Sequence, residues 1–384
     1  MTASVKKILI ASDSFKGCLS SEDAGKYLGE GIKESYPEAD IAVFPFADGG
    51  EGTASCINFH RGGRWKKLYV RDPLLRPVLS EYLILKNENT AIIELAMASG
   101  LELLHSSERK PLKTSTFGTG ELIRDALKEG VQNIILTIGG SATVDGGAGI
   151  ASALGFSFLD GHGGQIEPVT GRRLVEINKI CSTAINSRLQ QTKITIACDV
   201  DNFLNGEEGA ARVYGPQKGA DAYAVSLLER GLKHLSDLIF EETGFDADSH
   251  PGTGAAGGAA LFLLAYGNGK LRSGFEIVSE LTGLADSIKN ADLVISGEGK
   301  IDRQTAYGKV VSSIARISAE NNVPFAGACG QVEGSRESLK KELGAIELYS
   351  LSDLALSDED SLNNAPAYLK KTGKLIGHNI IPFL

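Results

Sequence analysis

Both ends of the sequence alternate short apolar runs with segments of helical period. Apolar runs of this length suit strands that are buried on both faces of a sheet. After the first run, residues 20–23 offer an N-cap and an acidic first turn for a helix that reaches Tyr36. We expect strands at 7–11, 41–46, 292–296, 324–329 and 346–351, and later helices at 309–321 and 335–343. Alternation of this kind predicts an α/β fold with a doubly wound parallel sheet.

The middle of the sequence has a different pattern. Residues 64–94 hold three candidate strands joined by short connections, which predicts antiparallel pairing. A chain of 384 residues also exceeds one typical domain of ~150 residues. We therefore expect a discontinuous, doubly wound domain made of residues 1–74 and 286–384, with a second α/β domain inserted at 75–285.

Charge and composition exclude several classes of function. Lys plus Arg number 39 and Asp plus Glu number 48, so the net charge is −9, which disfavours binding to nucleic acid. The longest apolar run, 255–266, is shorter than the ~18 residues of a membrane span, and the N-terminus lacks the apolar core of a signal peptide. The five cysteines have no metal-finger spacing, as expected in a reducing compartment. We expect a cytoplasmic protein with small-molecule partners; its oligomeric state, including a homo-oligomer, stays open.

Glycine is the outlier of the composition. The chain has 46 glycines, about 12% of its residues against ~7% on average, and they gather in clusters with Asp, Ser and Thr. Ligands of open α/β sheets bind beyond the carboxyl ends of strands, so glycine clusters that follow strands are candidate sites. The first two are residues 13–17, with Asp13, Ser14 and Lys16, and residues 47–53, with Asp48. Each is explained equally well as a turn with glycine at positive φ and a polar helix cap.

The third cluster, residues 139–147, follows an apolar run. Its two glycine pairs let backbone N–H groups converge on phosphate oxygens, and a helix beginning near Gly147 would point its positive end at the anion. The alternative is a turn with caps, which would need far fewer residues of this composition. The residues that we predict to hold phosphate are Gly139, Gly140, Ser141 and Thr143.

The fourth cluster, residues 252–258, contains a literal G-x-G-x-x-G string. The segment before it is polar and ends in proline rather than forming a strand, so we exclude a nicotinamide site. Gly254, Gly257 and Gly258 can still bring backbone close to a phosphate. Tight packing of small residues between helices is an equally good interpretation.

Further carboxylates and lysines come from a fifth cluster and two shorter ones, residues 198–202 and residues 215–219, the second of which holds Lys218 and precedes a predicted long helix. Residues 296–305 alternate acids and cations, among them Glu298 and Asp302, but no Walker A string occurs in the sequence. Asp199 and Asp201 stand at the end of a strand, where paired acids can hold Mg²⁺ together with substrate phosphates. The histidines show no ligand pairing.

The clusters, taken together in their order along the chain, identify a protein family more specifically than any single cluster does. The sequence resembles the bacterial glycerate kinases of type I along the whole chain, through the ordered series DSFKG at 13, ADGGEGT at 47, GTGE at 118, GGSAT-x-DGG at 139, CDV-x-N at 198, GPQKGA at 215, GTGAAGG at 252 and GEG-x-x-D-x-QT-x-x-GK at 297. The resemblance implies ATP-dependent phosphorylation of D-glycerate with Mg²⁺, on a two-domain fold whose discontinuous domain is flavodoxin-like and whose site lies between the domains. The departures from the family pattern are Val144 for Asn, Phe203 for Pro, and Val311 and Ser313 for Pro and Gly.

The clusters and the resemblance together give each residue a predicted role. The predicted catalytic residues are Asp199, as general base or metal ligand, Lys16 and Asp48, and the predicted metal ligands are Asp48 and Asp302. We assign to ATP the residues Gly139, Gly140, Ser141, Thr143, Gly254, Gly257 and Gly258. We assign to the substrate Asp13, Ser14, Lys218, Glu298 and Lys309. Which glycine loop holds ATP and which holds glycerate stays open.

Two other functions compete with this prediction. A non-catalytic regulator that binds a phosphometabolite would need the glycine donors but not the surplus of carboxylates in the loops. A hydroxy-acid dehydrogenase lacks the structural context of its fingerprint at residue 252. The sequence therefore predicts a glycerate kinase; from the resemblance alone we expect 2-phosphoglycerate as the product, with 3-phosphoglycerate as the alternative.

Overall fold

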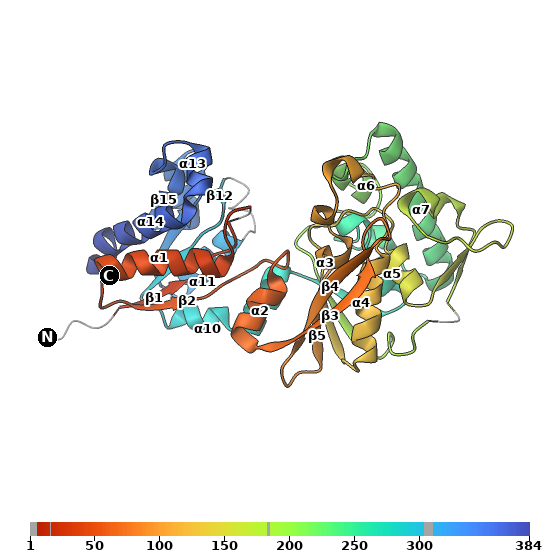
Figure 1. The fold of residues 1–384 in the computed structure, drawn as a ribbon, viewed down its shortest axis with the longest axis horizontal. Helices are drawn as coiled ribbons and strands as arrows, with labels where there is room; N and C mark the ends of the chain where they lie inside the picture. The colour runs from red at the N-terminus through yellow and green to blue at the C-terminus, as the bar shows by residue number, and fades with distance from the viewer. Residues whose placement is uncertain (1–5, 16, 183–184, 303–309) are drawn as a thin grey trace. The chain divides into compact units, whose positions relative to one another are not determined.

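The computed structural model describes residues 6–15, 17–182, 185–302 and 310–384. The chain folds into two compact units, one made of Met1–Asp48 and Val278–Leu384, the other of Gly49–Ile277 (Figure 1). Each unit has its own sheet and its own apolar core. Among the described residues, no helix has the length and apolarity needed to cross a bilayer.

The first unit alternates strands and helices from both ends of the chain. Its elements are β1 (Lys7–Ile10), α1 (Ser21–Ser35), β2 (Asp40–Val43), α10 (Leu284–Lys289), β11 (Leu293–Ser296), β12 (Lys300–Ile301), α11 (Val310–Glu320), β13 (Phe325–Cys329), β14 (Gln331–Val332), α12 (Arg336–Leu343), β15 (Glu347–Ser350), α13 (Asp358–Asn363) and α14 (Ala365–Asn379). The main sheet is parallel throughout, in the order β2-β1-β11-β13-β15. Counted along this unit the order is 2-1-3-4-5, that of flavodoxin, and it reverses between β1 and β11.

Apolar residues on one face of this sheet explain where its helices lie. Ile8 and Ile10 of β1 share a core with Leu28 of α1 and Leu369 of α14. Helix α1 begins where the sequence predicts, because the Ser20 hydroxyl accepts a hydrogen bond from the Asp23 N–H at 3.1 Å. Helices α11 and α12 contact the strands as well as each other. The predicted doubly wound, flavodoxin-like domain is therefore confirmed as an architecture.

The second unit mixes antiparallel and parallel strands. Its elements are α2 (Thr53–Arg61), β3 (Gly63–Arg71), β4 (Pro77–Leu85), β5 (Thr90–Glu94), α3 (Ala96–Ser99), η1 (Leu101–Leu103), α4 (Phe117–Lys128), β6 (Asn133–Thr137), α5 (Ala148–Ala153), β7 (Ser157–Leu159), β8 (Lys179–Cys181), β9 (Lys193–Ala197), α6 (Ala210–Tyr214), η4 (Pro216–Lys218), α7 (Ala222–Thr243), η6 (Ala255–Gly257), α8 (Leu261–Ala265), β10 (Asn268–Arg272) and the start of α9 (Gly274–Thr282). The sheet order is β10-β9-β6-β5-β4-β3. Strands β3, β4 and β5 pair antiparallel, as predicted, whereas β5, β6, β9 and β10 run parallel.

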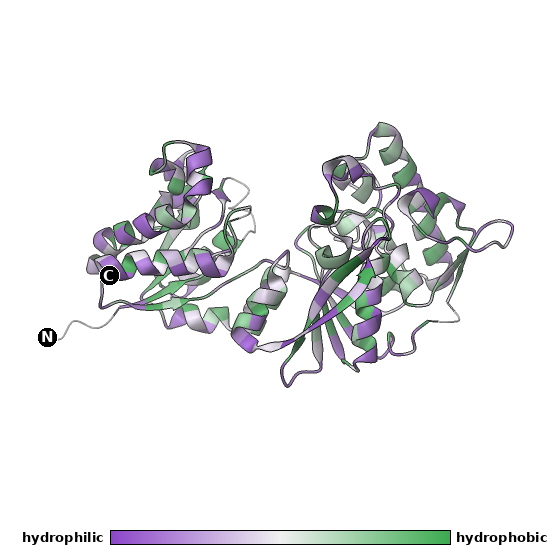
Figure 2. Ribbon diagram, viewed as in Figure 1, coloured by the Kyte–Doolittle hydropathy of each residue, from purple (hydrophilic) through white to green (hydrophobic). Residues whose placement is uncertain are grey.

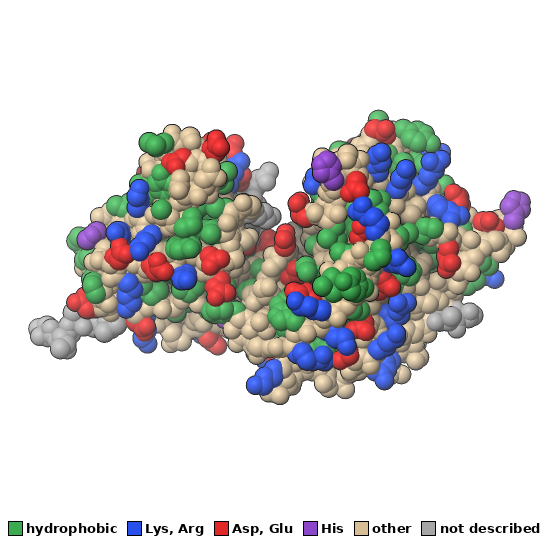
Figure 3. Space-filling model, in the orientation of Figure 1, with side chains coloured by type: hydrophobic (Ala, Val, Ile, Leu, Met, Phe, Trp, Pro, Cys, Tyr) green, Lys and Arg blue, Asp and Glu red, His purple; other side chains and the backbone are tan. Residues whose placement is uncertain are grey.

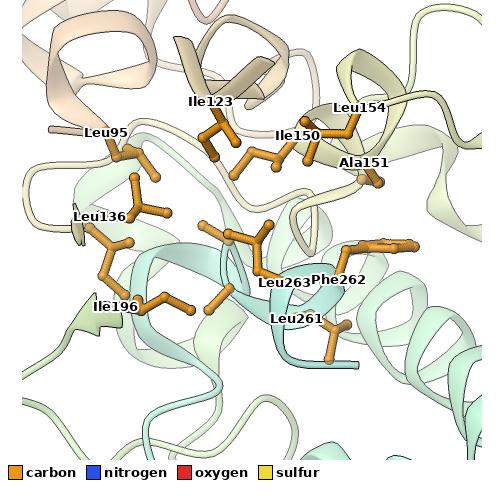
Figure 4. Packing of buried hydrophobic residues seen from close by; sticks show 14 of the residues in the cluster. Leu95, Ile123, Leu136, Ile150, Ala151, Leu154, Ile196, Leu261, Phe262 and Leu263 are labelled. Atoms are coloured by element: carbon orange, nitrogen blue, oxygen red, sulfur yellow. The ribbon is translucent and has the colours of Figure 1, made fainter. Parts of the chain in front are cut away.

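The core of the second unit lies between its sheet and the helices that follow the parallel strands. Leu136 of β6 and Ile196 of β9 point toward Ile150 of α5 and Leu263 of α8 (Figure 4). In Figure 2 hydrophobic residues are prominent in the strands of both units, although β3 also carries several hydrophilic residues, and the helices carry hydrophilic residues on part of their surface. The carboxyl ends of β5, β6, β9 and β10 are therefore fixed side by side at one edge of a rigid sheet.

The boundaries of the two compact units differ from the domain boundaries that we predict from the sequence. The sequence put a boundary between residues 74 and 75, but β3 and β4 pair from Gly63 with Leu85 to Arg71 with Pro77, so that boundary falls in the turn of a continuous hairpin. The contacts divide the chain after Asp48 instead, and again after Ile277, within α9. Strand β2 is likewise shorter than the predicted 41–46 and ends at Val43.

Candidate active site

The loop Gly49–Thr53 lies across the carboxyl ends of the parallel strands of the second unit. Gly49 has φ +94°, and a Cβ there would lie 2.7 Å from the Cα of Gly274 and 3.1 Å from the Cβ of Ala197. A Cβ on Gly139 would lie 3.2 Å from the Cα of Gly50. Glycine is required because the loop touches the ends of β6 and β9 and the start of α9 directly. The structure thus brings together two clusters that the sequence treated separately, residues 47–53 and residues 139–147.

Glu94, at the end of β5, holds this loop from the sheet. Its Oε1 accepts a hydrogen bond from the Ala54 N–H at 2.7 Å, and its Oε2 accepts one from the Gly52 N–H at 3.4 Å. The residue is 6% exposed, and burial raises the pKa of its carboxyl above the usual range. The sequence analysis missed Glu94; the signal available was a single acid ending an otherwise apolar strand.

The predicted phosphate loop follows β6 at the same edge. Gly139 and Gly140 are exposed, and Gly140 has φ +70°. The backbone of this loop is fastened by the Leu101 N–H, which donates to the Gly140 carbonyl at 2.8 Å, and by the Ala142 N–H, which donates to the Ser99 carbonyl at 2.9 Å. The loop is therefore a fixed turn that leaves its glycines accessible.

Lys218, in η4, is buried against this loop. Its Nζ donates to Ser141 Oγ at 2.6 Å and to the Thr143 carbonyl oxygen at 2.7 Å, and the residue is 3% exposed. Burial lowers the pKa of Lys218 to about 7, although the nearby Asp145 carboxylate acts in the opposite direction. The sequence assigned Lys218 to the substrate; in the structure its amino group donates to the phosphate loop. Thr143 Oγ1 is also buried and has no hydrogen-bond partner among the described residues.

Asp145 organises the backbone behind the loop. Its Oδ2 accepts hydrogen bonds from the Thr116 N–H at 2.7 Å and the Thr116 hydroxyl at 2.9 Å, and also from the Gly149 N–H at 3.2 Å. Its Oδ1 accepts one from the Gly147 N–H at 3.3 Å. Burial raises the pKa of this fully enclosed carboxyl. Asp145 thus joins the starts of α4 and α5, a structural role.

Asp199 lies on the other side of the Gly49–Thr53 loop, after β9. Its Oδ1 accepts a hydrogen bond from the Ser273 hydroxyl at 2.7 Å and one from the Gly274 N–H at 3.0 Å. The side chain is exposed. Asp199 is therefore held in a fixed orientation at the start of α9 and still faces solvent, as its predicted role as a base or metal ligand requires.

The glycines of the cluster 252–258 are placed differently. Gly254, Gly257 and Gly258 are all buried. A Cβ on Gly254 would lie 2.1 Å from the Phe203 carbonyl oxygen, and one on Gly257 would lie 2.2 Å from the Thr143 carbonyl oxygen. These contacts favour the tight-packing interpretation over phosphate binding, because the glycines support the loops that precede α5 and α6.

In the first unit, the predicted substrate residues gather where the strand order reverses. The Asp13 N–H donates to the Gly297 carbonyl at 2.9 Å, so the loops after β1 and β11 are joined next to Ser14 and Glu298. Asp302 follows β12 and lies 3.6 Å from Lys300 Nζ. Asp48 is half-buried at the end of this unit's first segment. Lys16 and Lys309 lie outside the described residues.

The donor set limits how a metal ion would be held. Within the described part of the chain, His, Cys, Asp and Glu side chains form no group of three or more arranged for a metal ion. The half-buried carboxylates Asp48 and Asp302 would instead suit Mg²⁺ held by one or two protein ligands and completed by substrate phosphates. Figure 3 shows charged side chains of both signs spread over the visible face of each unit.

We compared the sequence and the fold with those of known proteins to find related proteins. The model of the glycerate kinase family matches residues 8–380. The chain belongs to the glycerate kinase family. It is 41% identical over 371 residues to the glycerate kinase of Halalkalibacterium halodurans, covering 96% of this chain and 97% of that protein. It is 39% identical over 345 residues to the glycerate 2-kinase of Escherichia coli K12, covering 90% and 88%.

A solved structure agrees with the fold as well. The crystal structure described as glycerate kinase 2 from Salmonella typhimurium LT2 has a TM-score of 0.84 and 39% sequence identity, covering 97% of each chain. Because the chain belongs to this family and is about 40% identical to glycerate kinases over most of its length, it is an enzyme of the kinase class.

Proposed function

We propose that the protein transfers the γ-phosphoryl group of ATP to D-glycerate in the presence of Mg²⁺ and forms 2-phosphoglycerate. The observation that carries the proposal is the exposed Gly139–Gly140 turn, braced by Lys218, in a chain that belongs to a kinase family. The relative from Escherichia coli is named a glycerate 2-kinase, which supports the choice of hydroxyl. The enzyme is proposed to work in the cytoplasm.

Phosphoryl transfer depends on positioning and on neutralising charge more than on covalent chemistry by the protein. In the proposed reaction the 2-hydroxyl oxygen of glycerate bonds to the γ-phosphorus, and the bond from that phosphorus to the β–γ bridging oxygen breaks, releasing ADP. The hydroxyl proton passes to a carboxylate, for which Asp199 is our candidate. When bound, Mg²⁺ would neutralise charge on the phosphate oxygens, and Asp48 and Asp302 are the proposed ligands.

We propose further roles for the other predicted residues. The backbone N–H groups of the loop 139–143 would hold phosphate oxygens, since glycine lets an anion approach closely. Asp13, Ser14 and Glu298, together with Lys16 and Lys309, keep their proposed roles in substrate binding. For Gly254, Gly257 and Gly258 we propose support of the neighbouring loops, and for Lys218 support of the phosphate loop.

The test is turnover of ATP with D-glycerate and Mg²⁺, with the product identified by phosphorus NMR. We expect release of ADP only when all three are present, at about 1–100 s⁻¹, and a phosphorus resonance coupled to the proton on C2 of glycerate. Reactions without glycerate, or with a chelator of divalent cations, serve as controls. ATP binding without any turnover would favour a regulatory protein, and 3-phosphoglycerate as sole product would overturn the choice of hydroxyl.

A further inference from the structure

The start of α2 is capped by a residue far away in the sequence. The first N–H groups of a helix have no partner within the helix, and a side chain at the N-cap position usually accepts from them. Here the N-cap residue is Gly52, with φ +85° and no side chain. Glu94 supplies the acceptor instead, through its hydrogen bonds with the N–H groups of Gly52 and Ala54. A carboxylate at this position also interacts favourably with the helix dipole.

Burial of Glu94 costs more free energy than a helix cap alone would justify. The residue is buried at the end of a central strand, and among the described residues it forms no salt bridge. A buried carboxylate without a cation costs free energy that a neutral cap would avoid. Its carboxyl is opposed further by Glu51, from the loop, and by Glu81, from β4, both of which raise its pKa. Stability therefore does not explain why this residue ends β5.

The Glu94 carboxylate holds the Gly49–Thr53 loop, and this loop contacts the other parts of the candidate site. The Thr53 hydroxyl donates to the Gly50 carbonyl at 2.8 Å and closes the loop as a turn. Gly50 lies against Gly139, and Gly49 lies against Gly274, the residue whose N–H donates to Asp199. A displacement of this turn would therefore be transmitted to the phosphate loop and to the candidate base.

We propose that Glu94 is a positioning residue of the kinase, whose ionised carboxylate fixes the Gly49–Thr53 turn against the strand ends that carry the phosphate loop and Asp199. The proposal rests on the proposed function. It also assigns the N–H groups at the start of α2 to Glu94, so that phosphate binding falls to the loop after β6. A misplacement of about 1 Å at a reacting centre can reduce a rate by about a hundredfold.

The discriminating variant is Glu94→Gln. Glutamine has nearly the same shape, and its oxygen can still accept from one N–H, but its amide nitrogen can only donate and leaves the other N–H without an acceptor. We expect kcat to fall by roughly tenfold to a hundredfold with the thermal midpoint unchanged or higher, since a buried charge has been removed. The part of the acid limb of the wild-type kcat profile that protonation of Glu94 causes should be lost in the variant, so that only the limb set by the proposed base remains.

A matched control is Glu81→Gln on β4, which removes a similar charge and leaves both hydrogen bonds of Glu94 in place. Glu81 lies 3.3 Å from Lys67 and has no role in the site. The plateau of kcat should stay the same, while the acid limb should move to lower pH, because one of the charges that raise the pKa of Glu94 is gone. Glu94→Asp keeps the charge on a shorter side chain and should recover part of the activity.

Hydrogen exchange provides a readout that does not depend on turnover. The N–H groups of Gly52 and Ala54 should exchange faster in Glu94→Gln than in the wild type. The proposal is overturned if the Gln variant keeps kcat within about twofold at every pH, or if activity and thermal midpoint fall together with an unchanged pH profile. A wild-type enzyme without activity on D-glycerate would contradict the proposed function instead, and the exchange measurement would still decide the role of Glu94.

Discussion

Lys218 Nζ lies 2.6 Å from Ser141 Oγ, so a buried amino group braces the loop on which phosphate binding is proposed. A second bond from the same Nζ, to the Thr143 carbonyl oxygen, holds the loop at another point. Because burial lowers the pKa of Lys218 to about 7, this brace changes its charge near neutral pH. The loop therefore has a titratable support that is separate from the groups proposed to contact substrate.

Replacing Lys218 tests this relationship through stability as well as rate. In Lys218→Met the loop loses both bonds, and we expect a higher KM for ATP and a lower kcat. In the wild type the folded-state pKa of about 7 lies below the unfolded value of ~10.4, so between them the unfolded chain binds more protons. The free energy of unfolding should consequently rise with pH across that window, and this rise should be absent in the variant.

The control for Lys218 is Lys233→Met on α7, where the side chain is 54% exposed and pairs with Asp237. Denaturant titrations at several pH values give the comparison. The pH dependence of the unfolding free energy of the wild type is compared with that of Lys233→Met. If the wild-type value, after this comparison, does not change from pH 7 to about 10, Lys218 is not held neutral in the fold.

Gly140→Val tests the phosphate loop itself. A Cβ at Gly140 would lie no closer than 3.5 Å to Ala96 Cβ, so the cost of valine is the positive φ of +70° rather than a clash. Residues other than glycine pay about 1–2 kcal/mol for this conformation. We expect a modest loss of stability, but a large loss of turnover, because the side chain would cover the backbone that faces the phosphate.

Gly163→Val is the matched control for Gly140→Val. Gly163 also has positive φ, +80°, and a Cβ there would meet no atom within 4 Å. Both variants should lose similar stability, measured by chemical denaturation, while only Gly140→Val should lose activity. Equal steady-state rates in the two variants would remove the loop from the site.

The architecture was largely predictable because alternation and strand-end glycines are local signals. The parallel sheet of the first unit and the antiparallel hairpin of the second were both predicted from apolar runs and turn residues. The domain limit placed at residue 74 could not be settled in this way, since it depends on which strands pair, and pairing of β3 with β4 is a contact between segments.

The candidate site was predictable in part for the same reason. Asp199 and Gly139 carry signals in their own loops, and the structure places them at one sheet edge, both next to the Gly49–Thr53 turn. The place of Glu94 and the hydrogen bonds of Lys218 could not be predicted, because they depend on partners 40 and 77 residues away. A glycine string such as 252–258 is ambiguous from the sequence alone, because buried packing and phosphate binding both select glycine.

The metal requirement can be tested on its carboxylates. If Asp48 and Asp302 are ligands, Asp48→Asn and Asp302→Asn should each raise the Mg²⁺ concentration needed for half-maximal rate, since neutral amides bind Mg²⁺ more weakly. Asp358→Asn, an exposed acid in the first turn of α13, is the control. The measurement is the initial rate as a function of free Mg²⁺ at saturating ATP. Curves that superimpose on the wild type would leave the metal to other carboxylates.

Asp199→Asn is the most demanding test, because the residue proposed as the base also anchors the start of α9. Asparagine keeps an Oδ1 that can accept from the Ser273 hydroxyl and the Gly274 N–H, so the start of α9 should be preserved. It cannot accept the proton of the substrate hydroxyl. A positioned base contributes about 10²–10⁴-fold, equivalent to roughly 3–5 kcal/mol, so kcat should fall by that order at an unchanged thermal midpoint.

Ser273→Ala removes one of the two bonds to Oδ1 and leaves the carboxylate; it should reduce kcat far less. Steady-state kinetics and thermal unfolding on both variants decide the assignment. If Asp199→Asn keeps kcat within about threefold of the wild type, the carboxylate serves only to anchor α9, and the base must be sought at Asp48 or Asp302.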